Sequence, residues 1–190
     1  MSQDGNAKQP AGSAGAVGAG GGIPMEDMPE LVIVSGMSGA GRTEAMHVFE
    51  DLGYFCVDNL PASLIGNLFE LGGMSELPGQ PAGECRIAVV CDARNRMFFS
   101  GLTDELRELD GRGLEYRILF LDASDEKLIA RYKSSRRRHP LCEDGTSIEQ
   151  GIQRERSLLF GLREMAHHVV DTTDMLPQQL RQRIRELFAT

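Results

Sequence analysis

Eight residues carry the clearest chemistry in this chain. They read G-M-S-G-A-G-R-T, and the P-loop pattern that holds the phosphates of a nucleoside triphosphate is G-x-x-x-x-G-K-[S/T]. The glycines allow the backbone to curl until successive N–H groups point at an anion. We therefore predict that phosphate is bound by Gly36, Met37, Ser38, Gly39, Ala40, Gly41, Arg42 and Thr43.

Arg42 departs from this pattern, because a lysine normally reaches the outer phosphates at its position. Guanidinium is planar and bulkier than ammonium, so Arg42 can neutralise phosphate without reproducing the geometry of lysine. Hydrolysis depends on where charge is placed in the transition state, so we expect hydrolysis to suffer more than binding. Alternatively, Arg42 only opens a helix and points to solvent. Thr43 stands where a hydroxyl ligates Mg²⁺.

The elements around this loop alternate between strand and helix. The apolar, β-branched run from Leu31 to Val34 predicts a buried strand, and residues 42–52 predict an amphipathic helix. Such alternation is typical of a parallel sheet with helices on both faces. We predict an α/β fold of the P-loop NTPase, kinase-like type, with three layers and a five-stranded, mainly parallel sheet. Its other strands are predicted at 54–57, 86–91, 116–121 and 168–170, and its other helices at 61–71, 97–109, from 124 onward, at 147–165 and at 177–188.

Acidic residues follow three of the predicted strands, namely Asp58, Asp92 and Asp122. Ligands of such sheets bind beyond the carboxyl ends of the strands. Asp92 is the preferred acidic partner of Mg²⁺, together with Thr43, and with Arg42 it is a candidate catalytic residue. Asp122 is the rival for this role, although each of the three carboxylates could instead cap a helix or a turn.

One basic cluster stands out on an otherwise acidic chain. Arginine suits bidentate contacts with phosphate, so we predict that Arg136, Arg137 and Arg138 form a lid over the nucleotide. A solvated helix end, stabilised by the helix dipole, is the structural alternative, and contact with RNA is a third interpretation. The whole cluster comprises Arg131, Lys133, Arg136, Arg137, Arg138 and His139.

Composition limits the remaining classes. The 190 residues suffice for one α/β domain, while a net charge of −8 argues against general binding to nucleic acid or membranes. Residues 1–30 are rich in Gly and Ala and predict a flexible tail ahead of a domain at 31–190. The four cysteines show no paired spacing, which favours reduced thiols in a cytoplasm and makes a zinc site improbable.

Several segments together resemble the RapZ/YvcJ family of bacterial P-loop proteins. They are G-M-S-G-A-G-R-T, F-C-V-D-N-L-P, L-F-L-D-A-S-D-E-K-L-I-A-R-Y, R-R-R-H-P-L and V-V-D-T-T, and the resemblance runs from Leu31 to Phe188. It implies binding of ATP and GTP with weak hydrolysis, with ATP at residues 36–43. The proposed GTP-contacting segment of the family maps onto Asp92, Ala93, Arg94 and Asn95. Some members deliver a regulatory RNA to an endoribonuclease, an ability attributed largely to a C-terminal domain.

The chain departs from this family at Arg42 and stops at Thr190, where the second domain would begin. We therefore expect a cytoplasmic protein that binds ATP or GTP with Mg²⁺ and is at most a weak ATPase or GTPase. The alternatives are a non-catalytic nucleotide-sensing adapter and a small-molecule kinase. An RNA or protein partner would require the missing C-terminal domain, no membrane contact is expected, and a homo-oligomer is compatible with the sequence.

Overall fold

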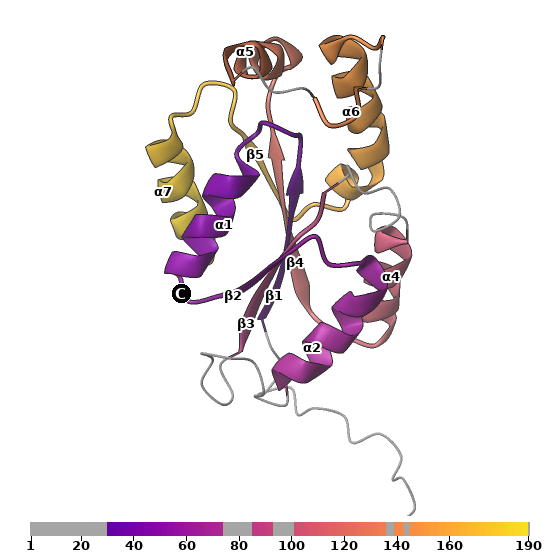
Figure 1. The fold of residues 1–190 in the computed structure, drawn as a ribbon. Coiled ribbons are helices and arrows are strands. Elements are labelled where there is room, and N and C mark those ends of the chain that lie inside the picture. Colours follow the sequence, from indigo (N-terminus) through magenta and orange to yellow (C-terminus); the bar gives the residue numbers. More distant parts are fainter. Residues whose placement is uncertain (1–29, 74–84, 93–100, 136–138, 143–144, 190) are drawn as a thin grey trace, which may run out of the picture.

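The structure is a computed structural model that describes residues 30–73, 85–92, 101–135, 139–142 and 145–189. Its described part contains one sheet with the strand order β2-β3-β1-β4-β5, in which every pairing is parallel (Figure 1). The predicted α/β class with a five-stranded sheet is confirmed. The strands are β1 (Glu30–Gly36), β2 (Phe55–Asp58), β3 (Arg86–Val90), β4 (Tyr116–Asp122) and β5 (His168–Asp171).

Alternate side chains of the central strand β1 enter two separate cores. Val32 and Val34 belong to one buried cluster, and Leu31 and Ile33 to the other. A strand that is buried on both faces must be apolar at every position, which explains the continuous run of apolar residues. The same rule holds for β3 and β4, which flank β1.

Helices cover both faces of the sheet (Figure 1). The first core is closed by α1 (Arg42–Asp51) and α7 (Pro177–Phe188), and the second by α2 (Ile65–Gly73) and α4 (Leu102–Gly111). At the top of Figure 1, toward which the strand arrows point, stand α5 (Asp125–Ser135) and α6 (Ile148–Glu164). These two helices therefore lie where a ligand of a parallel sheet is expected.

The predicted helices are present, with shifted boundaries. The segment after Pro61 begins as a short 3₁₀ turn, Ala62–Leu64, and becomes α-helical only at Ile65. The helix predicted to begin near residue 97 is described from Leu102, after Gly101 in a left-handed conformation. Residues 1–29, which include most of the predicted tail, lie outside the described part. Among the described residues, no helix is both long and apolar enough to cross a bilayer.

Candidate functional site

The P-loop, residues 36–43, connects the end of β1 to the start of α1. Its glycines have positive φ angles, +144° at Gly36, +91° at Gly39 and +107° at Gly41. A Cβ atom on Gly36 would lie 2.2 Å from the carbonyl oxygen of Leu121, so β4 leaves no room for any side chain there. Gly41 caps α1, and the positive end of that helix therefore opens onto the loop. The backbone has the strand–loop–helix geometry that the glycine spacing predicts.

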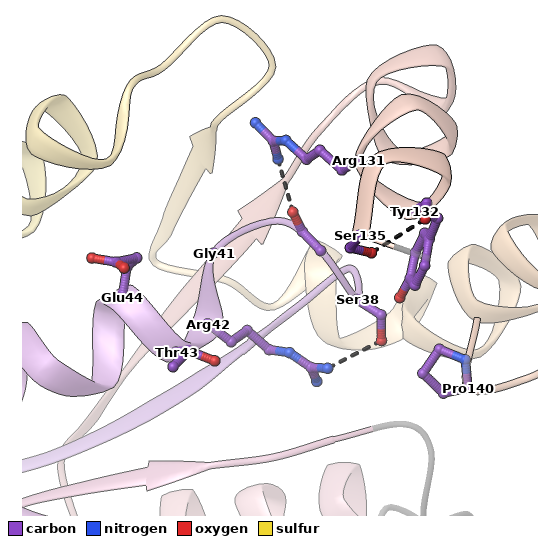
Figure 2. A pocket seen from close by; sticks show the side chains of 10 residues that line it. Ser38, Gly41, Arg42, Thr43, Glu44, Arg131, Tyr132, Ser135 and Pro140 are labelled. Carbon is purple, nitrogen blue, oxygen red and sulfur yellow. Dashed lines mark hydrogen bonds between the residues drawn. The ribbon is translucent and has the colours of Figure 1, made fainter. Parts of the chain in front are cut away.

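A pocket of about 370 Å³ lies over this loop (Figure 2). One wall consists of loop residues and the first turn of α1, including Arg42 and Thr43. The opposite wall consists of Tyr132 and Ser135 near the end of α5, and of Pro140. The predicted lid, Arg136–Arg138, lies outside the described residues, although Ser135, directly before it, and Pro140, two residues after it, both line the pocket.

Arg42 does not extend into solvent, so that alternative was wrong. Its side chain is only 11% exposed, and its Nη2 donates hydrogen bonds to Ser38 Oγ and Asp92 Oδ2, both at 3.1 Å. Figure 2 shows the contact with Ser38. The other terminal nitrogen, Nη1, is buried and has no hydrogen-bond partner among the described residues. An unsatisfied buried donor beside the pocket is a group to which a phosphate oxygen could bind.

The three acidic residues that follow strands differ in their surroundings. Asp92 is buried beside the loop and pairs with Arg42. Asp122 accepts hydrogen bonds from Arg156 and Arg163 of α6 and from the backbone N–H of Ala123, so its role as a turn residue is the observed one. Asp58 is exposed at the end of β2. Only Asp92 is therefore engaged by the P-loop.

Thr43 and Asp92 are the residues expected to hold Mg²⁺. In the described part, no group of three or more His, Cys, Asp or Glu side chains is arranged to hold a metal by itself. Mg²⁺ usually binds through one or two protein oxygens, with water and substrate phosphate as its other ligands. Of the described residues, Thr43 and Asp92 thus fit a Mg²⁺ ion that arrives with a nucleotide.

A buried carboxylate that the sequence analysis missed lies behind the loop. Glu155 of α6 is fully buried, and its two oxygens accept hydrogen bonds from the backbone N–H of Ser38 at 3.0 Å and from the Ser38 hydroxyl at 2.5 Å. It also lies 3.1 Å from His139 Nε2. His139, predicted as part of the basic cluster, is 1% exposed and therefore belongs to the interior of the site, not to the surface.

A sequence signal for Glu155 did exist. The buried face of α6 carries Ile152, Glu155, Leu159 and Leu162, at spacings of three and four residues. A charged residue in the middle of an apolar helical stripe indicates a buried polar contact, because an unpaired buried charge would be too costly. The partner of this residue could not be read from the sequence.

A second contact holds the outer side of the loop. Arg131, from the predicted basic cluster, donates hydrogen bonds to the carbonyl oxygens of Gly39 at 2.9 Å and Thr172 at 2.6 Å. The Thr172 hydroxyl lies 3.0 Å from the carbonyl oxygen of Ala40. Arg131 thus contributes to the shape of the loop, and the first of these contacts is visible in Figure 2.

The cysteines are free thiols. Burial raises the pKa of Cys91, directly before Asp92, to about 12, and burial likewise raises the pKa of Cys56 to about 12. Neither thiol is therefore ionised near neutral pH. Cys91 is a small buried residue of the second core, and Cys56 packs against the first.

The fold and the glycine loop together place this chain in the class of P-loop proteins with a kinase-like fold. Among solved structures it is similar to shikimate kinase from Acinetobacter baumannii in complex with shikimate, with a TM-score of 0.51 and 20% identity, over 86% of this chain and 94% of that chain. It is also similar to shikimate kinase from Bacteroides thetaiotaomicron, with a TM-score of 0.52 and 14% identity, over 85% of this chain and 99% of that chain. At such identities the similarity demonstrates the fold alone.

Residues 29–190 match the RapZ-like N-terminal domain. The chain belongs to this family, and the resemblance found in the sequence is confirmed. It is 49% identical over 168 residues to a nucleotide-binding protein of Moorella thermoacetica, covering 88% of this chain and 55% of that relative. It is 50% identical over 158 residues to one of Symbiobacterium thermophilum, covering 83% and 50%. The chain therefore spans about half the length of these curated relatives.

Proposed function

We propose that this domain binds a nucleoside triphosphate, ATP or GTP, together with Mg²⁺, and hydrolyses it slowly at most. The observation that carries the proposal is the P-loop at the end of β1, which opens with the N-terminus of α1 onto a pocket of about 370 Å³. Backbone N–H groups and a helix N-terminus bind phosphate whatever side chain stands at position 42. The names of the relatives, which are nucleotide-binding proteins, support the same proposal.

The phosphates and the metal would be contacted by three side chains, those of Arg42, Thr43 and Asp92. The buried Nη1 of Arg42 would donate to a phosphate oxygen, and the hydroxyl of Thr43 and the carboxylate of Asp92 would hold Mg²⁺. When bound, Mg²⁺ neutralises charge on the outer phosphates. Slow hydrolysis follows from the pairing of Arg42 with Asp92. A guanidinium fixed by a carboxylate is poorly placed to stabilise the negative charge that develops on the outer phosphate in the transition state.

A non-catalytic nucleotide sensor is the second candidate, and the same ion pair favours it. The two charged groups that would act on the outer phosphate and on Mg²⁺ contact each other at 3.1 Å. In this reading, nucleotide binding would signal to an RNA or protein partner through the part of the relatives that this chain does not span, and the protein would act in the cytoplasm. The choice between ATP and GTP would depend on residues 92–95, of which the structure describes only Asp92.

A matched pair of glycine variants tests phosphate binding. Gly39→Ala places a side chain at φ +91° inside the loop, where its Cβ would meet only ordinary contacts at 3.6 Å and 3.7 Å. Gly53→Ala imposes a similar strain at φ +83° after α1, with no atom within 4 Å. Both should lose about 1 kcal/mol of stability, because L side chains rarely adopt these angles.

Titration calorimetry with Mg-ATP and Mg-GTP should show binding by the unmodified chain and by Gly53→Ala. Gly39→Ala should bind at least about tenfold more weakly, a loss of roughly 1.4 kcal/mol. Absence of heat with both nucleotides in the unmodified chain would overturn the proposal, as would equal affinities of the two glycine variants.

A further inference from the structure

We propose that Glu155 is a positioning residue for the nucleotide site, which holds the P-loop and the opposite wall of the pocket in one arrangement. This inference rests on the proposed function, since the property that Glu155 sets is the affinity for nucleoside triphosphate. Glu155 itself contacts the loop from behind and is fully buried, so it does not touch the ligand.

The first step concerns Ser38, the third residue of the P-loop. Its backbone N–H and its hydroxyl both donate to Glu155, one to each carboxylate oxygen. With its hydrogen directed at Glu155, the Ser38 hydroxyl presents a lone pair to Arg42 Nη2 at 3.1 Å. Glu155 therefore orients both the loop backbone and, through Ser38, the guanidinium of Arg42.

The second step concerns His139, which follows the predicted lid. Its Nδ1 accepts a hydrogen bond from the backbone N–H of Leu141 at 3.2 Å, which assigns the hydrogen of the neutral ring to Nε2. That Nε2–H donates to Glu155 Oε2 at 3.1 Å. The ring also packs against Tyr132, with centroids 5.0 Å apart. Tyr132 and Pro140, next to His139, line the pocket wall that faces the P-loop.

The His139 ring packs closely against α6 at Gly151. A Cβ on Gly151 would lie 2.7 Å from His139 Nδ1, so only glycine lets this ring approach the helix. Gly151 stands one turn before Glu155 on α6. One helix thus supplies the space for His139 and the carboxylate that binds it.

The third step concerns why the residue is a carboxylate. Three donors converge on it, namely the Ser38 N–H, the Ser38 hydroxyl and the His139 Nε2–H. A carboxylate accepts from all three, whereas an amide would turn its N–H toward the Ser38 hydroxyl, which would then accept from both the amide and Arg42 and lose the acceptor for its own hydrogen. Burying a carboxylate is costly, and replacing the whole network by well-packed apolar side chains is often neutral or stabilising. The geometry of the site, more than stability, accounts for the residue.

The experiment compares Glu155→Gln with Glu164→Gln, an exposed glutamate at the end of the same helix. Affinity for Mg-ATP and Mg-GTP is measured by calorimetry at a temperature at which each variant is folded by circular dichroism. Glu155→Gln should weaken binding at least tenfold, whereas Glu164→Gln should change it less than twofold. Leu106→Ala, in the core on the far face of the sheet, gives a destabilised variant with an intact site and should retain unmodified affinity.

A double-mutant cycle keeps the inference testable if Glu155→Gln does not fold. Ser38→Ala removes one donor and keeps the backbone N–H, and His139→Phe removes another while retaining a ring against Tyr132. If Glu155 links the two, the loss of affinity in the double variant will differ from the product of the single losses by at least threefold. Strictly multiplicative losses, or unmodified affinity in Glu155→Gln, would overturn the inference. An unmodified chain that binds neither nucleotide would instead overturn the proposed function.

Discussion

The ends of β3 and β4 invite comparison, because both strands flank β1, both are buried and apolar, and an aspartate follows each run. Asp92, after β3, pairs with Arg42 of the P-loop. Asp122, at the end of β4, pairs with Arg156 and Arg163 of α6. Aspartates at the carboxyl ends of the two strands that flank β1 thus serve different purposes, one at the candidate site and one in attaching a helix. The difference shows that the role of an aspartate at a strand end depends on which arginine the fold places beside it.

The largest expected effect is on stability, at the β4 end. Asp122→Ala removes two ion pairs and the hydrogen bond to the N–H of Ala123, and leaves Arg156 and Arg163 without this partner. Both arginines are partly exposed, so we expect a loss of about 2 kcal/mol in the free energy of unfolding, less than for a fully buried pair. Urea denaturation measures this loss. Nucleotide affinity of the folded variant should stay within about twofold of the original, and a much larger drop would show that Asp122 belongs to the site.

A smaller effect is expected on catalysis, at the β3 end. Arg42→Lys replaces a guanidinium held by Ser38 and Asp92 with a compact ammonium that can follow the outer phosphates. Multiple-turnover phosphate release should rise by about tenfold, or roughly 1.4 kcal/mol of transition-state stabilisation, while affinity changes less. An unchanged or lower rate would favour the nucleotide sensor over the slow hydrolase.

The smallest expected effect tests whether Asp92 contributes to the Mg²⁺ dependence of nucleotide binding. Asp92→Asn removes a negative charge that Arg42 already neutralises in part, so its effect on Mg²⁺ should be limited. We expect the ratio of nucleotide affinities with Mg²⁺ and with EDTA to fall by about fivefold, close to 1 kcal/mol.

Asp58→Asn, at the exposed end of β2, serves as the control for this experiment and should leave the ratio unchanged. If Asp92→Asn also leaves the ratio unchanged, Asp92 contributes only its ion pair with Arg42. Asp92 and Asp122 would then both have structural roles alone.

Two side chains that hold the P-loop, Arg131 and Glu155, have partners that could not be predicted from the sequence. Arg131 is recognisable as a basic residue near the site, yet its contact with the carbonyl oxygen of Gly39 joins positions 92 residues apart. Likewise, Glu155 is visible as a charge on an apolar helix face, but its partner Ser38 is 117 positions away. Hydrogen bonds between distant segments depend on how helices dock, and local propensity carries no information on docking.

By itself, the sequence determined the strands, the helices and the glycine loop, because these depend on local causes. Continuous apolar runs require burial on both faces of a sheet, and the φ angles of Gly36, Gly39 and Gly41 require glycine or strongly favour it. Tertiary structure alone decided that Arg42 pairs with Asp92, that Asp122 belongs to α6, and that a buried carboxylate supports the loop. The physical reason is that a charged group takes its role from the nearest oppositely charged or hydrogen-bonding group in space, and chain folding brings those groups together.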